Sequence, residues 1–291
     1  MTSSLFKIFF IQDFFREELL GGAESNDSVL MAFLSQKYDV EKIHSSDLTP
    51  KLLKKNRKNL FLFSNFVLAA PQSIIYATNN CNYIIYEHDH KYVNTRDPSK
   101  FKDFKIPKGS IINYEFYKNA KSVVVLSKIC KKILEDNLNI HNVHSIGCSL
   151  WSDKKFSYIK SICSNPKNKK YAVLDSENPV KGRNHALEFC KNKNIKYDLI
   201  SSGNEENFLK QLSEYEILIF FPQVLETFSR LAAEAKMLNC NLLTRPNMLG
   251  FYSEECSKLG GLPLIVDLKE RRDTALCLFE KIINRVANLR E

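Results

Sequence analysis

Two glutamates, Glu226 and Glu234, stand eight positions apart in a segment, 226–238, that is predicted to be a helix. On a continuous helix, eight residues turn through about 800°, so the carboxylates lie on neighbouring faces about 12 Å apart along the axis. That separation is too large for an acid and a base acting on one bond, and it suits two groups that hold different parts of an elongated ligand. At a helix N-terminus, where Glu226 is predicted, backbone N–H groups also favour an anion. The alternative is that Glu226 only complements the helix dipole and that Glu234 is a surface residue.

Two glycine-containing loops are candidates for phosphate binding. Lys181 and Gly182 lie between a predicted strand and a predicted helix, and the pair Gly21 and Gly22 follows the first predicted strand. A glycine lets its backbone approach a ligand closely, and a lysine beside it supplies a positive charge for phosphate. Both arrangements also occur in plain turns, so neither is specific by itself.

Four consecutive titratable residues, 87–90, follow another predicted strand. At the carboxyl end of a strand such side chains can act as acid or base, orient hydroxyl groups or bind a metal. His88 and His90 are the candidates for a zinc pair, but no third ligand is identifiable, so no metal site is predicted. Lys91 and Arg96, in the same loop, are candidates for contacting a charged substrate.

The elements that position these motifs are short apolar runs alternating with longer segments of helical period. This alternation is typical of parallel sheets with crossover helices, so the expected fold class is α/β with two doubly wound, Rossmann-like units. Predicted strands lie at 5–11, 38–43, 60–63, 83–86, 122–126, 143–145, 171–175, 197–201, 217–221, 241–244 and 264–266. Predicted helices lie at 24–36, 49–55, 66–78, 110–119, 127–137, 182–193, 206–212, 226–238, 252–259 and 269–289.

The length of 291 residues is about twice that of a common domain, so two domains are expected. The boundary is predicted within 152–170, where apolar periodicity fades and Ser, Asn, Pro and Lys accumulate. We expect a first domain at 1–160 and a second at 161–291, with the last helix packing back on the first. Ligands of open α/β sheets bind at the carboxyl ends of the strands, so the active site is expected in a central cleft that both domains face.

The second domain resembles a known family. The pattern of Glu226 and Glu234, followed by a strand and by the segment 247–251, resembles the nucleotide-binding domain of retaining GT-B glycosyltransferases. The resemblance is strongest to the family-4-like group and to compact transferases of phages and marine microbes. It implies that Glu226, with Thr227 beside it, faces the donor sugar and that Glu234 bonds the nucleotide ribose.

The same resemblance assigns the donor diphosphate to Lys181 and Gly182, with Arg183 as a further cation, and places the glycine pair of the first loop beneath the phosphates. The family commonly has another basic residue shortly before the lysine, whereas Glu177 and Asn178 occupy that stretch here. Charge neutralisation by these residues and by helix N-termini implies a metal-independent enzyme.

In the first domain the family places a histidine against the donor sugar, which corresponds here to His88 or His90. Asp89 and Glu87 are then the residues that contact the acceptor or orient that histidine. Ser127, after a predicted strand, matches the position of a serine in the family, and its alternative role is that of a helix N-cap.

The implied activity is transfer of a sugar, with retention of configuration, from a UDP-, GDP- or ADP-sugar to a hydroxyl group. The expected acceptor is a glycan or lipid-linked glycan, and the second choice is a hydroxymethylated pyrimidine in phage DNA. The alternative function is a catalytically silent module of the same fold that binds a nucleotide sugar or a polyanion. A dinucleotide oxidoreductase is disfavoured because no G-x-G-x-x-G follows either first strand.

Composition supports a chain that works near polyanions. The formal net charge is +9, and five basic residues gather in 51–58. This cluster suits DNA or an anionic membrane surface, and its alternative is a solvated helix face. The apolar runs are shorter than the roughly 18 residues of a transmembrane helix. The 8 cysteines stand singly, which favours reduced thiols in the cytoplasm, or the host cytoplasm if the protein is viral.

Overall fold

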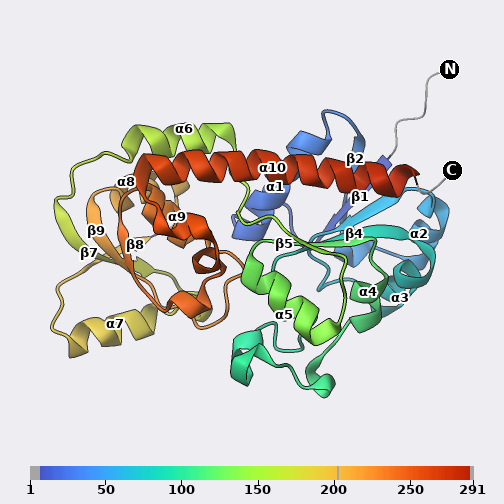
Figure 1. Cartoon of the computed structure of the whole chain (residues 1–291), viewed down its shortest axis with the longest axis horizontal. Helices are drawn as coiled ribbons and strands as arrows, with labels where there is room; N and C mark the ends of the chain where they lie inside the picture. The colour runs from blue at the N-terminus through green and yellow to red at the C-terminus, as the bar shows by residue number, and fades with distance from the viewer. Residues whose placement is uncertain (1–6, 202, 289–291) are drawn as a thin grey trace. The chain divides into compact units, whose positions relative to one another are not determined.

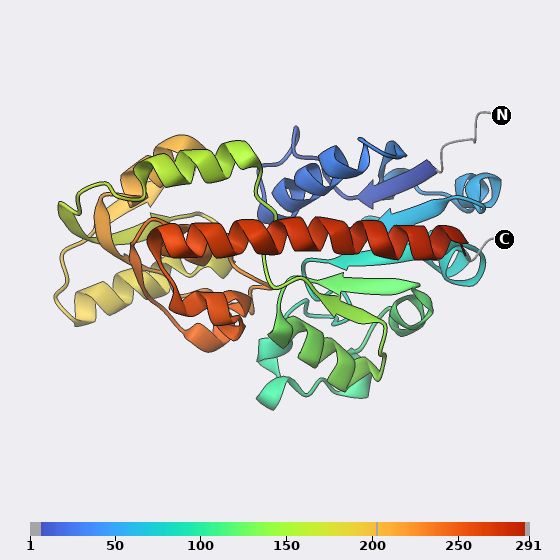
Figure 2. The same cartoon turned by 45° about the horizontal axis from the view of Figure 1, so that its top comes forward.

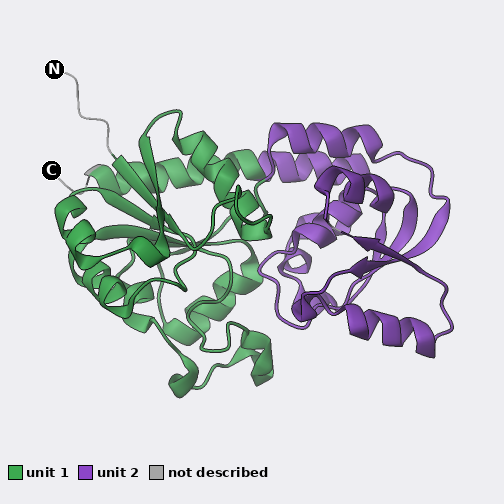
Figure 3. Ribbon diagram, turned by 180° about the vertical axis from the view of Figure 1, so that it is seen from behind, with its two compact units in different colours: residues 1–150, 272–291 green, residues 151–271 purple. Residues whose placement is uncertain are grey.

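The structure of the protein is a computed structural model that describes residues 7–201 and 203–288. The chain divides into unit 1, residues 1–150 with 272–291, and unit 2, residues 151–271 (Figure 3). The boundary predicted at 160 falls inside a helix that the sequence analysis missed, α6 (Asp153–Ile162). The stretch rich in Ser, Asn, Pro and Lys is instead the loop between α6 and the next strand. The last helix, α10 (Gly261–Asn288), begins in unit 2 and belongs to unit 1 from Arg272 onward.

Unit 1 contains a parallel six-stranded sheet in the order β2-β1-β3-β4-β5-β6 (Figures 1 and 2). Its strands are β1 (Lys7–Gln12), β2 (Asp39–His44), β3 (Leu60–Phe63), β4 (Asn82–Glu87), β5 (Ser122–Val125) and β6 (Val143–Ser145). Its other helices are α1 (Gly22–Leu34), α2 (Pro50–Asn56), α3 (Pro71–Asn80), α4 (Tyr114–Asn119) and α5 (Lys128–Leu138). The strand order reverses between β1 and β3, as in doubly wound sheets.

The core of unit 1 explains why the central strands of its sheet are mainly apolar. Every residue of β3 and β5 is buried, because helices cover both faces of a parallel sheet. Phe63 packs edge to face against Phe116 of α4, with ring centroids 5.0 Å apart. On α10, Phe279 packs against Tyr86 of β4 at 4.9 Å, so this part of the last helix covers the sheet of unit 1.

Unit 2 contains a parallel four-stranded sheet in the order β10-β9-β7-β8, which reverses between β7 and β9. Its strands are β7 (Lys169–Asp175), β8 (Asp198–Ser201), β9 (Tyr215–Ile219) and β10 (Asn241–Leu243). Besides α6, its helices are η5 (Pro179–Lys181), α7 (Arg183–Asn192), α8 (Glu205–Leu212), α9 (Arg230–Met237), η6 (Pro246–Met248), η7 (Gly250–Ser253) and η8 (Glu255–Lys258). The prediction of an α/β fold with two doubly wound parallel sheets is confirmed.

Two predicted elements of unit 2 are wrong. The predicted strand 264–266 lies inside α10, where Leu264, Ile265 and Leu268 are buried and Val266 is 49% exposed. That burial follows the spacing of a helix face and not the alternation of a strand. The predicted α-helix 252–259 consists instead of the 3-10 turns η7 and η8.

Candidate functional site

The loop after β7 depends on a glycine. Gly182 has φ +71°, and a Cβ atom placed on it would lie 1.8 Å from the carbonyl oxygen of Phe221, in the chain that follows β9. The backbone N–H of Gln223 donates to the carbonyl of Val180 at 2.8 Å, which joins the same two segments. No side chain fits at residue 182. The glycine lets the loop after β7 approach the chain after β9 closely, and this approach places Lys181 beside that chain.

Lys181 and Glu226 meet at the point where the strand order of unit 2 reverses. The Nζ atom of Lys181 lies 2.7 Å from Oε1 of Glu226, and these side chains are 37% and 12% exposed. Lys181 follows β7 and Glu226 follows β9, the neighbouring strands on either side of the reversal. The carboxyl edge of a sheet at such a reversal is where ligands of doubly wound folds bind.

The predicted helix 226–238 begins later than expected. The N–H of Glu226 donates to the carbonyl of Met248 at 3.0 Å, and its carbonyl accepts from Gly250 at 2.9 Å, so this residue is extended. The helix α9 starts only at Arg230, after Ser229, whose backbone is left-handed with φ 77°. The estimate of 12 Å along one helix therefore does not apply to the two glutamates.

Glu234, in α9, belongs to a different network of unit 2. It is 7% exposed, and Nε1 of Trp151 donates to its Oε1 at 2.8 Å. Lys155 and Arg230 form ion pairs with the same oxygen at 3.4 and 3.7 Å. The guanidinium of Arg230 lies 4.9 Å from the centre of the Trp151 ring. Glu234 is thus a buried, oriented carboxylate and not a surface residue.

The other predicted donor ligands of unit 2 are placed differently. Arg183, at the start of α7, pairs with Asp175 at 2.6 Å, and Thr227 is partly exposed directly after Glu226. The structure therefore brings together Lys181, Gly182 and Glu226, while Arg183 contacts the carboxylate at the end of β7.

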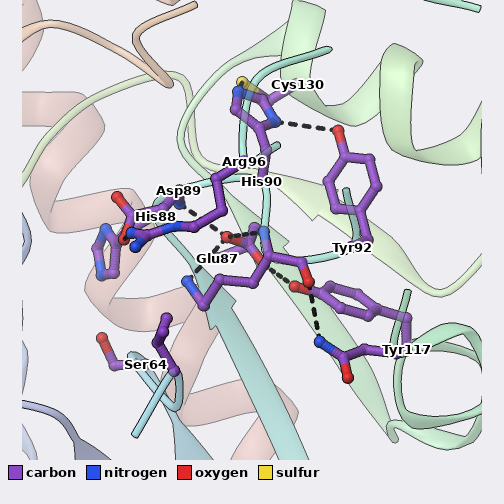
Figure 4. A network of polar contacts seen from close by, with 12 residues as sticks. Ser64, Glu87, His88, Asp89, His90, Tyr92, Arg96, Tyr117 and Cys130 are labelled. Carbon is purple, nitrogen blue, oxygen red and sulfur yellow. Dashed lines mark hydrogen bonds and ion pairs between the residues drawn. The ribbon is translucent and has the colours of Figure 1, made fainter. Parts of the chain in front are cut away.

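In unit 1, His88 contacts a carboxylate that the sequence analysis missed. Its Nε2 lies 3.0 Å from Oδ1 of Asp27, on α1, and Ser64 donates to the other oxygen of Asp27. All three side chains are buried at the carboxyl edge of the sheet. Asp89, predicted to orient a histidine, pairs with Arg96 at 2.5 Å (Figure 4). Nothing in the local sequence marks Asp27, because its role depends on the fold bringing α1 to the end of β4.

Glu87 organises the loop that carries His88. Its carboxylate accepts from Lys91 Nζ at 2.9 Å, from the Asp89 N–H at 2.7 Å and from the hydroxyl of Tyr117 (Figure 4). Burial alone raises the pKa of Glu87, but Lys91 and Tyr117 outweigh it and the pKa is lowered. Glu87 and Lys91 are both 2% exposed, so the prediction that Lys91 contacts a charged substrate is wrong.

His90 is enclosed. Its Nδ1 lies 3.0 Å from the Tyr92 hydroxyl and its Nε2 lies 4.0 Å from the Cys130 sulfur, in the group shown in Figure 4. Burial lowers the pKa of His90 below its usual 6.5 and keeps the ring neutral. Both ring nitrogens thus contact side chains of the core.

The buried neutral His90 predicts a pH dependence of stability. The folded pKa lies below 6.5, so the unfolded chain binds the proton first and the stabilisation present above pH 6.5 is lost as the pH falls. We expect His90→Asn, which suits the left-handed backbone at this residue (φ 56°), to flatten the decline between pH 7 and 5. The change in slope is at most about 1.4 kcal/mol per pH unit. Urea unfolding at each pH measures it; an unchanged slope, or the same flattening in the exposed His141→Asn, contradicts it.

The glycine pair lies at the N-terminus of α1. A Cβ on Gly21 would lie 2.0 Å from Oε2 of Glu24, so the missing side chain leaves room for that carboxylate. Glu24 is 6% exposed, and burial raises its pKa. Ser127 caps α5 by accepting from the N–H of Cys130 at 3.4 Å, in agreement with its alternative role.

The described part of the chain has neither a metal-binding cluster nor a membrane-spanning helix. Across 7–201 and 203–288, no group of three or more His, Cys, Asp and Glu side chains could hold a metal ion. In the same part of the chain, no helix has both the length and the apolar character needed to cross a membrane.

The two doubly wound parallel sheets and their helices give this chain a GT-B fold. No protein-family model and no curated protein matches the sequence of the chain. Among solved structures, it is similar to Anabaena Alr3699/HepE in complex with UDP and glucose, with 11% identity, a TM-score of 0.52, and 98% and 99% of the two chains covered.

Two further solved structures have the same fold. An alpha-glucosyltransferase in complex with UDP and a 13-mer DNA containing an HMU base is 9% identical with a TM-score of 0.51, over 98% of this chain and 95% of that chain. A glycosyltransferase from Rickettsia africae ESF-5 is 12% identical with a TM-score of 0.53, over 97% and 99%. At these identities the likeness establishes the fold.

Proposed function

We propose that the protein is a retaining, metal-independent glycosyltransferase that moves a sugar from a UDP-, GDP- or ADP-sugar to a hydroxyl group. The observation that carries this proposal is the contact of Lys181 with Glu226 beside Gly182, at the strand reversal of a GT-B unit. UDP is the first donor nucleotide to test, because solved structures of the same fold hold it.

In this proposal the donor changes the partner of Lys181. The ammonium group neutralises the diphosphate, which is a stronger partner than one carboxylate because it carries more negative charge. Glu226, released from the ion pair, accepts hydrogen bonds from hydroxyls of the donor sugar, with Thr227 beside it. Glu234, held by Trp151, presents its second oxygen to the ribose hydroxyls. Arg183 serves as the further cation when it leaves Asp175.

Unit 1 supplies the groups for the reacting sugar and the acceptor. His88 is the histidine proposed to face the donor sugar, because the ring of His90 is enclosed by Tyr92 and Cys130. Asp27 fixes the ring of His88. Retention without an enzyme nucleophile fits attack from the face of the departing phosphate, which takes the proton of the acceptor hydroxyl.

The remaining assignments concern the first glycine loop, the acceptor and the location of the protein. The sequence analysis places the glycine pair 21–22 beneath the donor phosphates. The buried carboxylate of Glu24 lies against Gly21, so a phosphate there competes with it for the same space. Asp89 stays a candidate for acceptor contact. The acceptor is a glycan, a lipid-linked glycan or a hydroxymethylated pyrimidine in DNA, and a catalytically silent binding module is the alternative function. A cytoplasmic location stays a prediction.

Binding and hydrolysis of UDP-, GDP- and ADP-sugars, measured with EDTA present, test the donor site. We expect one nucleotide sugar to bind and to be hydrolysed slowly. Glu234→Ala and Lys181→Ala are each expected to weaken donor binding by about tenfold or more, as for charged groups in a site. Glu255→Ala, which removes a surface carboxylate of unit 2, is the matched control. Thermal unfolding separates lost binding from lost folding. Absence of binding of any nucleotide sugar would refute the proposal, and binding without turnover would support the silent module.

A further inference from the structure

A second feature of unit 1 is the segment 94–113 between β4 and α4, which we call the basic loop. It contains five basic and two acidic residues and three short 3-10 turns, η2 (Pro98–Lys100), η3 (Lys102–Phe104) and η4 (Lys108–Ser110). Figure 1 shows it, coloured teal, beyond α5 at the bottom of the view. At this length it is long for a connection between a strand and a helix, and such loops are commonly functional.

The basic loop is held in one conformation by specific hydrogen bonds. The side chain of Asn137, on α5, accepts from the N–H of Ile106 at 2.7 Å and donates to the carbonyl of Phe104 at 2.9 Å. Asp97 caps η2 by accepting from the Ser99 N–H at 3.0 Å. The charges on the loop are therefore presented by a fixed backbone.

Four lysines of the basic loop are exposed and outnumber the one exposed carboxylate among them, Asp103. They are Lys100, Lys102, Lys105 and Lys108. Among residues 7–201 and 203–288, none of their ammonium groups forms an ion pair with a carboxylate, whereas Arg96, at the start of the loop, pairs with Asp89. Like charges on an ordered loop repel one another, and an anionic partner relieves that repulsion.

The basic loop begins beside the candidate active site and extends away from it. Asn137, which holds residues 104 and 106, lies at the end of α5 opposite the carboxyl end of β5. The loop leaves the carboxyl end of β4 a few residues after His88 and Asp89, at the edge of the sheet where ligands bind. The cluster at 51–58 differs, because α2 runs back from the carboxyl end of β2 to the amino end of β3. Most of its cations, from Lys54 to Lys58, therefore lie toward the opposite edge. The sequence analysis did not single out the basic loop.

We propose that the basic loop binds the phosphate backbone of a DNA duplex and thereby places a nucleobase hydroxyl acceptor at unit 1. This inference rests on the proposed function and selects among its acceptors. A neutral glycan gives no use for four exposed lysines. A bilayer surface is usually bound by exposed apolar side chains beside the basic ones. Within 94–111 no large apolar side chain is among the exposed ones, and the nearest, Ile112 and Tyr114, are 40% and 38% exposed.

The test compares two variants that each remove four positive charges, one from the basic loop and one from the cluster at 51–58. The loop variant is K100A/K102A/K105A/K108A, and the matched control on and after α2 is K54A/K55A/R57A/K58A. The probe is a short DNA duplex, since phosphate contacts do not depend on sequence. We expect the loop variant to bind at least about tenfold more weakly and to reduce the slope of log K against log salt by about 3.6. The control variant is expected to keep the affinity and the salt slope of the wild type.

Each other outcome has a defined meaning. Equal weakening in both variants, or no duplex binding by the wild type, overturns the proposal. Loss of binding to phosphatidylglycerol vesicles in the loop variant, with duplex binding unchanged, assigns the loop to a membrane and also overturns it. Donor hydrolysis is expected to be unchanged in both variants. A protein that binds the duplex through the loop but binds no nucleotide sugar would contradict the proposed function and leave the loop assignment intact.

Discussion

Gly182→Ala is expected to abolish most donor binding and to destabilise the protein by about 3 kcal/mol. A left-handed backbone costs an alanine about 1 kcal/mol, and a backbone clash adds to this. The new Cβ would lie 1.8 Å from the Phe221 carbonyl oxygen, so the loop must move away from the chain after β9. Lys181 then loses its place beside Glu226. Isothermal titration with the nucleotide sugar and urea unfolding measure the two effects.

Gly109→Ala is the matched control for Gly182→Ala. Its backbone is not left-handed, and a Cβ there meets no heavy atom within 4 Å. We expect a change in stability within about 0.5 kcal/mol and unchanged donor affinity. If Gly182→Ala binds the donor as tightly as the wild type, the close approach of the two segments is not needed for the site.

The loop containing Gly182 shows which part of the site the sequence could predict. A lysine and a glycine between a strand and a helix indicated the segment, because strand ends can be read from short apolar runs. The partner of Lys181 could not be read in the same way. Glu226 was predicted within a helix, but its backbone hydrogen bonds go to Met248 and Gly250, far along the chain. Tertiary pairing here overrides the helical period of the segment.

The fold itself was more predictable than the site. The strand β3 begins and ends at the predicted residues, since it is a short, fully buried apolar run. The strand β6 also has the predicted bounds, although only the first of its three residues, Val143, is apolar. The run Leu-Ile-Val at 264–266 has the same local character, and only the burial of Leu268 and the exposure of Val266 identify it as helix. A short apolar run does not distinguish a strand from one turn of a buried helix.

For the polar residues at the end of β4, the sequence could predict their place in the chain but not their surroundings. Their position was predicted, but their division into buried and available groups was not, because it depends on neighbouring elements. Glu87 and Lys91 are enclosed by Tyr117 and Phe66, which come from other segments of unit 1. His88 is oriented by Asp27 from α1. These contacts arise only when the sheet and its helices are assembled.

Lys91→Met is expected to destabilise the protein by about 3–5 kcal/mol, the usual cost of leaving one partner of a buried ion pair uncompensated. Glu87 and Lys91 are each 2% exposed and lie 2.9 Å apart. Methionine retains most of the aliphatic volume against Phe66, so the loss reports mainly the charge. Lys132→Met, which breaks a pair with Asp136 whose side chains are 75% and 59% exposed, is expected to cost less than about 1 kcal/mol.

The pH dependence of the Lys91→Met effect separates charge from packing. The pKa of Glu87 is lowered in the folded wild type from its usual 4.5, so the stabilisation by the pair is present above that pH and is lost as the pH falls through the folded pKa. In Lys91→Met the carboxylate takes up a proton more readily, which relieves its buried charge. The difference in unfolding free energy between wild type and variant should therefore be largest near pH 7. It should shrink as the pH falls, first through the pKa of Glu87 in the variant and then through its lowered pKa in the wild type. A difference that stays constant over this range would mean that Lys91 acts through its packing on Phe66 and not through its charge.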